Sequence, residues 1–487
     1  MIKLISRWWS RKKHVEPPVP SFFESDWYLQ FYPDVARAQM SAWTHFNRHG
    51  RYEGRFASEQ HTRFWCDANA NVPKQVESIA EWWDLSVADK NYFVWVYARW
   101  HALHDDWSSV VALMSHFDFQ GDASNPHENM LMPCVLFYQS LCKTDPSAAV
   151  GQWKKLVERY QGSPVIDFLT ANHQLSNGSV EGWLESLNHL YQRNELSPIS
   201  LVENQARFDA LIAGDIDKNN SNESCKVSVI IPVYNAVNTL PTALRGLLQQ
   251  TWKNLEIIIV DDASTDNTLA IAYEWQQQDH RISVIPLKQN QGAYAARNAG
   301  MQAAIGDFLT VHDADDWSHP MKLALQAQTL IDDESIVASL SHWTRVSKDL
   351  ELGSWKDPSG WSGLCHRNIS SLMIRRQVIE EIGFWDKVRC SADTEYYYRL
   401  QIYYGQGCLK EVLPGVPLAM GRLSTGSLTQ QSALSIFTIY SGVRRAYARS
   451  YNDWHRQVNH KEELYMRINN RVRLFNAPSA MTVESKE

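Results

Sequence analysis

The sequence of 487 residues lacks a long apolar segment, a paired cysteine motif and an excess of basic residues. No stretch approaches the roughly 20 apolar residues that a membrane-spanning helix requires. The seven cysteines are dispersed without a Cys-x-x-Cys pair, which indicates reduced, buried thiols rather than a disulfide framework or a zinc site. The net charge of -7 argues against a general nucleic-acid-binding protein, which is normally basic. We therefore expect a cytoplasmic protein whose partners do not include nucleic acid.

Residues 1–20 form a basic tail that lacks the uninterrupted apolar core of a secretory signal. Within residues 1–13, Lys3, Arg7 and Arg11 recur at helical spacing, and apolar side chains lie between them. A short basic amphipathic helix of this kind can lie on an anionic membrane surface. Residues 1–13 are thus a candidate for peripheral contact with the inner face of the cytoplasmic membrane. The alternative is a frayed, solvated tail.

The chain is long enough for about three domains, and changes in composition divide it into five segments. These are a basic tail (1–20), a small aromatic-rich helical module (21–60), an α-helical region (61–220), an α/β region (221–428), and C-terminal helices with a tail (429–487). The α-helical region repeats a helix–turn–helix pattern that aligns Trp153 with Trp183. This pattern resembles tetratricopeptide-like helical pairs, which usually bind a protein partner or brace a neighbouring domain.

Between Val227 and Asp316 the sequence repeats one arrangement three times: an apolar run, then Asn or Asp, then a helical pattern. The runs are Val-Ser-Val-Ile-Ile-Pro-Val-Tyr-Asn (227–235), Glu-Ile-Ile-Ile-Val-Asp-Asp (256–262) and Asp-Phe-Leu-Thr-Val-His-Asp-Ala-Asp-Asp (307–316). Val and Ile without alternation predict parallel strands that are buried on both faces, and ligands of such sheets bind beyond the carboxyl ends of the strands. The three polar ends should therefore meet in one crevice. Its carboxylates would repel a bare diphosphate but accommodate one bound to Mg²⁺ or Mn²⁺, which predicts a nucleotide-activated substrate.

Five motifs in this part of the chain resemble glycosyltransferase family 2, which has the GT-A fold. They are residues 227–235, Ile-Val-Asp-Asp-Ala-Ser-Thr-Asp-Asn-Thr (259–268), Asn-Gln-Gly (290–292), Ala-Ala-Arg-Asn-Ala-Gly (295–300) and His-Asp-Ala-Asp-Asp (312–316). The resemblance covers about Lys226 to Thr429 and implies an α/β, Rossmann-like catalytic domain with a mostly parallel sheet. It also implies inverting, metal-dependent transfer of a sugar from a nucleotide-sugar donor to a glycan or lipid-linked glycan acceptor.

The aromatic-rich module at 21–60 carries a second resemblance. Its Asp-Trp-Tyr (26–28) and Tyr-Pro-Asp (32–34) are similar to a short segment at the front of some bacterial surface-polysaccharide glycosyltransferases. The resemblance implies a role in bacterial surface polysaccharide synthesis for a catalytic domain with an N-terminal helical extension.

Asp313 and Asp315 match the Asp-x-Asp signature of the family. At the end of a strand, two carboxylates two residues apart point to the same side. The resemblance implies that one ligates the cation, Mn²⁺ or Mg²⁺, while the other holds the ribose or a metal-bound water, so Asp313 is also a donor-binding candidate. Hard divalent cations bind few carboxylates together with substrate phosphates, and the cation then acts as a Lewis acid on the leaving nucleoside diphosphate. Asp316 is expected to cap the following helix.

Further donor-binding candidates follow from the same resemblance. One of Asp261 and Asp262 is expected to contact the nucleobase or ribose, and the other to cap or orient the loop; the sequence leaves open which is which. Asn290 and Arg297 match positions that contact the nucleotide, and the guanidinium of Arg297 suits either a phosphate or an ion pair with nearby carboxylates. The residues expected to shape the loop against the base are Pro232, Tyr234 and Asn235.

The segment Cys-Ser-Ala-Asp-Thr-Glu-Tyr-Tyr-Tyr-Arg-Leu (390–400) resembles the acceptor side of the family, where an acidic residue opens a helix that faces the acceptor hydroxyl. The resemblance places the catalytic base at Asp393. Glu395 is the rival catalytic candidate, because Ala392 stands where relatives often have Glu. A carboxylate at a helix N-terminus keeps a low pKa, so positioning would have to supply much of the catalytic effect. The alternative is that Asp393 only caps the helix.

Between the metal site and the base, a loop that contains Gly, Ser and Pro carries Trp355, Trp361, His366 and Arg367. Aromatic faces stack on sugar rings, so these four residues are candidates for the acceptor site or for the donor sugar. Ordinary packing is the alternative. Further along the chain, Arg422, Ser424 and Thr425 are candidates for closing over the diphosphate as a lid.

From Cys225 onward the pattern alternates strands and helices. The periodicity predicts helices over 238–252, 264–278, 292–304, 320–331, 393–404, 440–455 and 462–474, strands over 282–287 and 336–346, and disorder in the last dozen residues.

Two other functions fit parts of the sequence. One is a helical-repeat scaffold with a catalytically silent GT-A domain, against which the intact Asp313, Asp315 and Arg297 argue. The other is a nucleotidyltransferase, which also combines a parallel sheet with carboxylates and a metal. That class normally has a Gly-rich phosphate loop with a basic residue after the first strand, whereas this chain has Tyr-Asn-Ala-Val-Asn (234–238) there.

Overall fold

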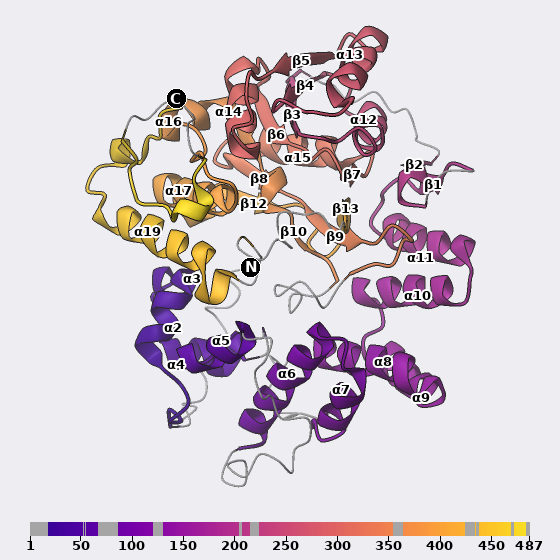
Figure 1. The fold of residues 1–487 in the computed structure, drawn as a ribbon. Helices are drawn as coiled ribbons and strands as arrows, with labels where there is room; N and C mark the ends of the chain where they lie inside the picture. Colours follow the sequence, from indigo (N-terminus) through magenta and orange to yellow (C-terminus); the bar gives the residue numbers. More distant parts are fainter. Residues whose placement is uncertain are drawn as a thin grey trace. The chain divides into compact units, whose positions relative to one another are not determined.

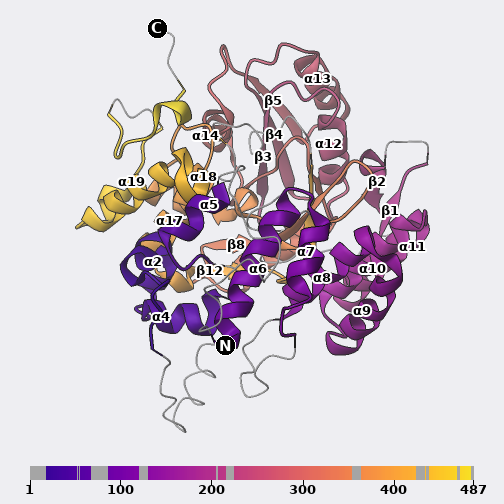
Figure 2. The ribbon, with the colours of Figure 1, turned by 60° about the horizontal axis from the view of Figure 1, so that its bottom comes forward.

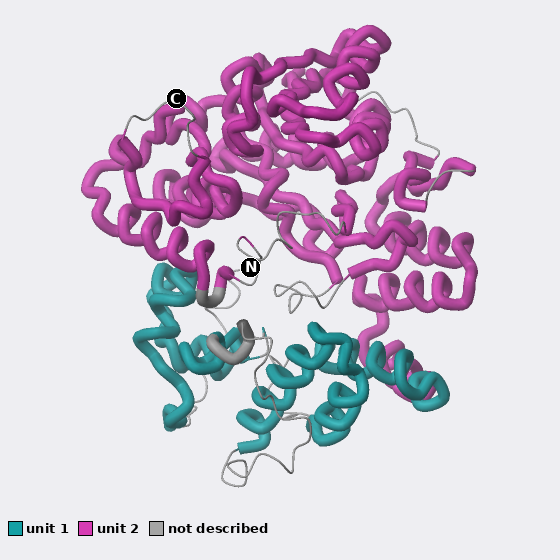
Figure 3. Tube along the Cα trace, in the orientation of Figure 1, with its two compact units in different colours: residues 1–149 teal, residues 150–487 magenta. Residues whose placement is uncertain are grey.

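The computed structural model describes residues 18–51, 53, 55–66, 86–119, 130–203, 207–214, 224–353, 364–423, 434, 438–468 and 472–483. The chain divides into two compact units, residues 1–149 and 150–487, shown in different colours in Figure 3. The expected tail at residues 1–13 lies outside the described residues. The five segment boundaries expected from the sequence stay predictions.

Unit 1 is helical over its described residues. Its helices are α2 (Ser25–Phe31), α3 (Pro33–Arg37), α4 (Ala42–His45), the π-helical turn η1 (Phe46–Gly50), α5 (Glu59–Cys66), α6 (Val87–Leu103), α7 (Trp107–Met114) and α8 (Leu131–Thr144). The aromatic-rich module folds around Phe23, Tyr28 and Phe46, which are buried. The hydroxyl of Tyr28 lies 2.9 Å from Nδ1 of His45, and burial together with the charge of Arg55 lowers the pKa of His45 to about 4. His45 is therefore part of the packing of this module.

Helix α9 (Pro146–Arg159) spans the division between the units, and unit 2 continues with the antiparallel pair α10 (Pro164–Ser176) and α11 (Val180–Arg193). The side chain of Ser179 caps α11 by accepting the N–H of Gly182 at 3.0 Å. A hairpin follows, made of β1 (Ile199–Leu201) and β2 (Leu211–Ala213) with the 3₁₀ turn η4 (Phe208–Ala210) before β2. The helix–turn–helix pattern is thus present, whereas a tetratricopeptide-like repeat stays a prediction.

A seven-stranded sheet forms the centre of unit 2 (Figure 1). Its order is β12 (Leu409–Glu411), β8 (Ala338–Leu340), β11 (Met373–Arg375), β6 (Phe308–Val311), β3 (Val227–Val233), β4 (Leu255–Asp261) and β5 (Ile282–Pro286). All neighbouring pairs are parallel except those of β11, which is antiparallel to both β6 and β8. The α/β class with a mostly parallel sheet is confirmed.

Helices cover both faces of this sheet. They are α12 (Leu240–Leu248), α13 (Thr268–Gln278) and α15 (Lys322–Asp332) on one face, and α14 (Ala293–Ala303), α16 (Arg376–Ile382) and α17 (Ala392–Tyr404) on the other. Figure 2 shows α12 and α13 on the opposite side of β3 and β4 from α14. Every residue of β3 is buried: Val229 packs on the first face and Ile230 on the second, as expected for an unalternating apolar strand. A Cβ on Gly300 would collide with Ile230, so glycine in this motif lets α14 approach β3 closely.

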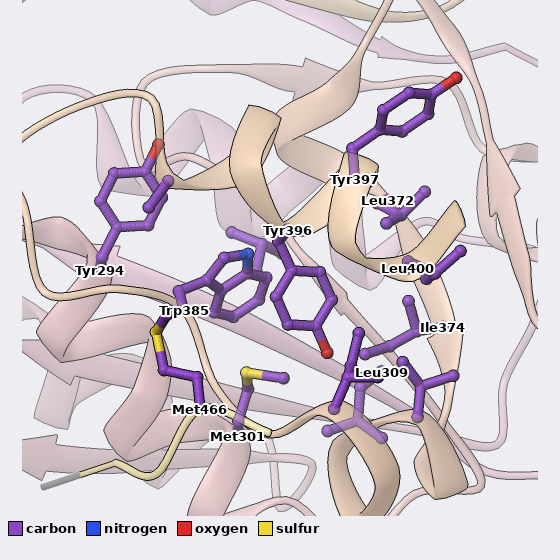
Figure 4. Close-up of a cluster of buried hydrophobic side chains, with 14 of the residues drawn as sticks. Tyr294, Met301, Leu309, Leu372, Ile374, Trp385, Tyr396, Tyr397, Leu400 and Met466 are labelled. Carbon is purple, nitrogen blue, oxygen red and sulfur yellow. The ribbon is translucent and has the colours of Figure 1, made fainter. Parts of the chain in front are cut away.

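The core on the α14 face continues into the C-terminal part of the chain. Figure 4 shows Met301, Trp385 and Tyr396 in this core. Residues of α19 (Val443–Gln457), which follows α18 (Thr438–Ser441), join the same core. The helix predicted over 462–474 is wrong for the described residues of that range, which form the short 3₁₀ turn η8 (Lys461–Leu464). The backbone of Met466 then bonds to Ile382 and Phe384 instead of continuing a helix.

The predicted disorder of the last dozen residues is also wrong as far as residue 483. The 3₁₀ turn η9 (Ser479–Met481) places a fully buried Met481 in the core, and its carbonyl oxygen accepts the N–H of Arg389 at 2.8 Å. Among the described residues, no helix combines the length and the hydropathy needed to cross a membrane.

A second, four-stranded sheet stands beside the first. Its order is β10 (His366–Arg367), β9 (His342–Val346), β13 (Pro417–Arg422) and β7 (Trp317–Ser318). One strand had been predicted over 336–346, and this is wrong. The alternating run breaks at Ser341, because β8 pairs with β11 and β12 in the first sheet while β9 pairs with β10 and β13 in the second.

Candidate active site

The site lies at the carboxyl ends of β3, β4 and β6, which are adjacent parallel strands. Val233 of β3 is opposite Asp261 of β4, and the N–H of His312, just after β6, donates to the carbonyl oxygen of Ile230 at 2.9 Å. The polar residues that follow the three strands therefore meet at one edge of the sheet, as the sequence predicted.

Asp262 and Asn235 organise the loops of this edge. The two carboxylate oxygens of Asp262 accept the N–H groups of Gln291 and Gly292, each at 2.7 Å, immediately before α14 begins. Asn235 has φ of 51°, a left-handed conformation that Asn tolerates, and its Oδ1 accepts the N–H of Thr265 at 2.8 Å. Both side chains are thus engaged with backbone, and Asp262 is the member of the acidic pair that orients a loop.

Asp261 differs from its neighbour in having an unused acceptor. Its side chain is buried, its Oδ2 accepts the N–H of Ser264 at 3.1 Å, and its Oδ1 has no hydrogen-bond partner among the residues that the structure describes. A buried carboxylate oxygen without a donor is costly, so a ligand N–H or O–H would stabilise it. The geometry makes Asp261 the candidate for contact with the nucleotide. Of the other donor candidates, Pro232 is buried within β3, whereas Tyr234 and Asn290 are exposed.

Arg297 of α14 lies against Asp313. Its Nη2 donates to Oδ1 of Asp313 at 2.6 Å, while its buried Nε and Nη1 have no hydrogen-bond partner in the described part of the chain. Burial would raise the pKa of Asp313, but the charge of Arg297 and its hydrogen bond outweigh this effect and lower it. Arg297 therefore forms the ion pair expected as one alternative, and it retains two donors for an anionic ligand.

Asp315 and Asp316 carry carboxylates that destabilise one another. Burial and the charge of Asp313 raise the pKa of Asp315, and burial with the charges of Asp315 and Asp313 raises that of Asp316 further. Asp316 does not cap a helix as expected, since its Oδ1 accepts the N–H of Arg422 at 3.2 Å and α15 begins only at Lys322. The carboxylate of Asp315 forms no ion pair with any described residue.

This arrangement fits a divalent cation held partly by substrate. No group of three or more His, Cys, Asp or Glu side chains in the described parts of the chain could hold a metal alone. Asp313 and Asp315 offer hard carboxylate oxygens, and a cation that they share with a diphosphate would offset the burial and the repulsion from Asp313 that raise the pKa of Asp315. The residues present therefore suit Mg²⁺ or Mn²⁺.

Basic residues that sequence reasoning missed surround these carboxylates. Arg345 of β9 acts on Asp313, Asp315 and Asp316, because its positive charge lowers the pKa of each and opposes the effect of burial. Lys322 is buried in α15, and burial lowers its pKa to about 8 although Asp316 and Asp313 act in the opposite direction. Neither residue belongs to a motif, and only its position in the fold identifies it.

Asp393 lies in the first turn of α17, whose N-cap is Ser391. Its side chain is partly exposed, and its Oδ1 accepts the N–H of Thr394 at 2.8 Å. Tyr294, a residue of α14 that the sequence did not single out, lies near Asp393: burial, and after it the charge of Asp393, raises the pKa of Tyr294. The guanidinium of Arg297 lies 4.8 Å from the centre of the Tyr294 ring. Tyr294 thereby joins the acceptor-side helix to the donor side.

A second link between these two parts of the site comes from Asn298. Its side chain donates to the carbonyl oxygen of Trp385 at 2.8 Å and accepts the N–H of Trp385 at 3.0 Å. The Arg-Asn pair of the motif at 295–300 therefore faces two ways, with Arg297 toward the carboxylates of the donor side and Asn298 toward the segment that precedes α17.

Glu395 occupies a different environment from Asp393. It is completely buried, and its Oε1 lies 3.0 Å from Nε of Arg399 and 3.1 Å from Nε2 of His455. Burial would raise the pKa of Glu395, but Arg399 and His455 lower it. An acceptor hydroxyl has no access to this carboxylate, so the geometry leaves Asp393 as the candidate base and makes Glu395 a structural ion-pair residue.

The acceptor candidates divide into two groups. Trp355 and Trp361 lie outside the described residues. His366 packs with its ring centre 5.8 Å from that of Trp343, and Arg367 donates from Nε to Oε1 of Glu411 at 2.9 Å. Arg367 is therefore committed at least in part to a strand-edge ion pair, and an acceptor role for these residues stays a prediction.

The fold and the site define an α/β domain with a carboxylate-rich crevice at the ends of its parallel strands. Residues 228–380 match the model of Glycosyl transferase family 2, so the chain contains a domain of this family.

Curated relatives agree with this assignment. Glycosyltransferase GlyA of Streptococcus pneumoniae is 45% identical over 92 residues, which are 19% of this chain and 13% of that protein. The uncharacterized glycosyltransferase YibD of Escherichia coli is 38% identical over 123 residues, 25% of this chain and 36% of that protein. An uncharacterized glycosyltransferase of Haemophilus influenzae is 28% identical over 230 residues, 44% of this chain and 87% of that protein. The chain therefore spans 13% of the length of GlyA and 36% of that of YibD.

Similar solved structures include Staphylococcus aureus TarS 1-349 in complex with UDP, with 20% identity, a TM-score of 0.34, and coverage of 41% of this chain and 61% of that chain. The mannosyltransferase PcManGT from Pyrobaculum calidifontis, in complex with GDP-Man and Mn2+, has 16% identity, a TM-score of 0.33, and coverage of 54% of this chain and 69% of that chain.

Proposed function

We propose that this protein is an inverting, metal-dependent glycosyltransferase that moves a sugar from a nucleotide-sugar donor to a hydroxyl of a glycan or lipid-linked glycan. One observation carries the proposal: a continuous path of contacts joins the carboxylates at the strand ends to a partly exposed carboxylate on a separate helix. Arg297 is paired with Asp313 at 2.6 Å and packs on Tyr294, and Tyr294 lies near Asp393, whose charge, after burial, raises the pKa of Tyr294. Donor and acceptor would meet along this path.

The donor side suits a nucleoside diphosphate. The free Oδ1 of Asp261 can accept an imino N–H, which uracil and guanine carry and cytosine lacks. The free Nε and Nη1 of Arg297 can donate to a ribose or phosphate oxygen. Asp313 and Asp315 would hold Mn²⁺ or Mg²⁺, and the bound cation would supply Lewis-acid stabilisation of the leaving diphosphate.

The acceptor side supplies a single accessible base. Asp393 would accept the proton of the acceptor hydroxyl while that oxygen bonds to the anomeric carbon. The bond from the anomeric carbon to the diphosphate oxygen breaks on the opposite face, and its electron pair leaves with the nucleoside diphosphate. Since Glu395 is buried in an ion pair, no second carboxylate of this helix is available for a double displacement, and one displacement inverts the configuration.

The remaining parts of the chain complete the proposal. The module at 21–60 resembles a segment of bacterial surface-polysaccharide glycosyltransferases, and this supports a role in the synthesis of such a polymer. Contact of residues 1–13 with the inner face of the cytoplasmic membrane, and binding of a protein partner by the helices before residue 220, belong to the same proposal.

The test is nucleotide-sugar hydrolysis by the full-length chain. UDP-, GDP- and CMP-linked sugars would each be incubated with Mn²⁺ or Mg²⁺, with and without excess chelator, and release of the nucleotide product would be measured. We expect metal-dependent release from at least one uracil- or guanine-containing donor.

Each other outcome has a definite meaning. Binding of a donor without release, even with acceptor glycans present, would indicate a catalytically silent scaffold. Release that survives excess chelator would contradict the metal site. Release of pyrophosphate from a nucleoside triphosphate and a sugar phosphate would indicate a nucleotidyltransferase.

A further inference from the structure

A cluster of charged residues beside the Asp313–Asp315 loop lies outside the segment that matches the family. Its two main members are Asp209 in η4 and Arg422 at the end of β13, which form an ion pair. We propose that Asp209 is a positioning residue that keeps the guanidinium of Arg422 away from the carboxylate of Asp315, so that this carboxylate stays free for the cation. The inference rests on the proposed function and adds a residue from the hairpin that precedes the α/β domain.

Arg422 contacts the loop that carries Asp313, Asp315 and Asp316 (the metal loop) through its backbone and its side chain. Its N–H donates to Oδ1 of Asp316 and its Nε donates to the carbonyl oxygen of Asp315, both at 3.2 Å. Its two terminal nitrogens donate to the two carboxylate oxygens of Asp209. One guanidinium therefore joins the metal loop to the hairpin, and it bonds to the backbone of Asp315 rather than to its carboxylate.

Asp209 is itself held in place from two directions. Its Oδ1 accepts the hydroxyl of Thr242 at 2.7 Å, and its carbonyl oxygen accepts Nη2 of Arg245 at 2.8 Å. The ring of Phe208 lies 4.1 Å below the guanidinium of Arg422. These contacts fix the direction of the carboxylate. Burial would raise the pKa of Asp209, but Arg422 and Thr242 lower it, so the group stays charged.

The helix that anchors Asp209 also contacts the metal loop. Thr242 and Arg245 belong to α12, and the neighbouring Gly246 faces Trp317, the residue after Asp316. A Cβ at position 246 would lie 3.1 Å from Cδ1 of Trp317, which shows how closely α12 approaches the strand that follows the loop. The hairpin, α12 and β7 thus form one packed frame around Arg422.

The physical need for Asp209 follows from the local charge balance. Asp313 is already paired with Arg297, whereas Asp315 has no ion-pair partner among the described residues. If Asp209 lost its charge, Arg422 would have an unpaired guanidinium next to the carboxylates of Asp315 and Asp316. The nearest available counter-charge would then be one of these carboxylates, and the guanidinium would compete with the cation for it.

The first test measures amide hydrogen exchange in the full-length protein without ligand. Asp209→Asn removes the charge and keeps the shape, and Asp167→Asn is the matched control, because Asp167 forms a comparable ion pair with Arg193 at 2.6 Å between α10 and α11. We expect exchange in peptides covering 313–317 and 420–422 to be about tenfold faster in Asp209→Asn, the effect of losing one charge-assisted hydrogen bond. The control should leave these peptides unchanged, and equal exchange in both variants would overturn the inference.

The second test titrates Mn²⁺ into the protein in the presence of saturating UDP or GDP. We expect about tenfold weaker Mn²⁺ binding in Asp209→Asn, and a smaller loss in Thr242→Val, which removes only the hydroxyl that orients Asp209. The double variant Asp209→Asn with Arg422→Gln should bind Mn²⁺ more tightly than Asp209→Asn alone, because the competing charge is gone.

Two outcomes would show that Asp209 only supports the structure and would overturn the inference. One is weaker Mn²⁺ binding in the double variant than in Asp209→Asn. The other is unchanged Mn²⁺ affinity in a folded Asp209→Asn protein. If the wild type binds no Mn²⁺ with either nucleotide, the proposed function fails, and the exchange experiment alone decides whether Asp209 holds the loop.

Discussion

The seven-stranded and the four-stranded sheet of unit 2 contribute opposite charges to the site and are built in different ways. In the larger sheet, β3, β4 and β6 are adjacent parallel strands that come from one 85-residue stretch (Val227–Val311), and each is followed by acidic or amide residues. The smaller sheet gathers β7, β9, β10 and β13 from segments between residues 317 and 422, and it supplies Arg345 and Arg422. The comparison shows that contiguous motifs encode the carboxylates and Arg297, whereas two further cations, Arg345 and Arg422, come from strands that are distant in the sequence.

The largest expected effect comes from the acidic edge. Asp315→Asn should lower transfer by about a thousandfold or more, because a neutral amide cannot hold the cation that stabilises the leaving diphosphate. Calorimetry with Mn²⁺ and nucleoside diphosphate, together with transfer assays and melting curves, is the measurement. Asp332→Asn, at an exposed position in α15, serves as the control. Normal turnover in the Asp315 variant would contradict the metal site.

The next effect tests the acceptor side. Asp393→Asn should lower transfer by roughly 10²–10⁴-fold, because the amide cannot accept the proton, with donor affinity and melting temperature nearly unchanged. Survival of transfer in this variant would remove Asp393 as the base.

Glu395→Gln is the comparison for that experiment and should behave differently. Losing the carboxylate leaves Arg399 and His455 buried without their counter-charge, which should destabilise the protein by about 3–5 kcal/mol. Urea unfolding measures this loss. Full stability combined with lost transfer would exchange the roles of the two carboxylates.

A third prediction addresses the cations of the smaller sheet. Arg345→Gln should weaken nucleoside diphosphate binding about tenfold, the effect of losing a hydrogen bond to a charged group, while Mn²⁺ alone should bind more tightly because a competing positive charge is gone. Separate titrations with nucleoside diphosphate and with Mn²⁺ measure the direction of each change in affinity. If both affinities fall together, the variant has disturbed the loop, and the proposed division of charge between the sheets is wrong.

A smaller effect is expected where the donor and acceptor sides meet. Tyr294→Phe removes the buried hydroxyl near Asp393 and keeps the ring under Arg297. We expect kcat to fall roughly fivefold, with the donor KM unchanged, because a polar group next to the proposed base is lost. If kcat falls and the donor KM rises by a similar factor, Tyr294 serves the donor site instead.

The smallest effect concerns stability in acid. Glu411 of β12 accepts Nε2 of His342 at 2.9 Å and pairs with Arg367, which ties the edge of the larger sheet to the smaller one. The hydrogen bond from His342, opposed by burial and aided by Arg367, lowers the pKa of Glu411 from 4.5 to about 2. A carboxyl with a lowered folded-state pKa stabilises the fold above pH 4.5, and this contribution disappears as the pH falls toward 2.

Glu411→Gln should therefore abolish this part of the acid dependence while leaving transfer near neutral pH unchanged. Urea unfolding between pH 6 and pH 3 measures it, with the exposed Glu351→Gln as the control. Parallel pH profiles in the wild type and the Glu411 variant would show that the link between the sheets contributes no stability.

Much of the larger sheet could be predicted because its signals are local. The apolar runs at 227–233 and 255–261, the helix around Arg297 and the first turn of α17 all lie where the periodicity placed them. Errors arose where a long-range contact outweighed a local pattern. The run at 336–346 divides between two sheets. The segment after Leu464 has a helical pattern in the sequence, but its backbone bonds to the chain near Gly383 instead of forming a helix.

The sequence by itself determined the fold class, the family resemblance and the acidic residues at the strand ends, because each depends on neighbours within a few positions. Only the tertiary structure decided which member of each acidic pair is available. Asp262 is occupied by the loop before α14 and Glu395 by Arg399 and His455, so that Asp261 and Asp393 remain. The same holds for Asp209, which meets Arg422 across 213 residues of chain. Charge pairing depends on distance in space, and no periodicity along the sequence encodes that distance.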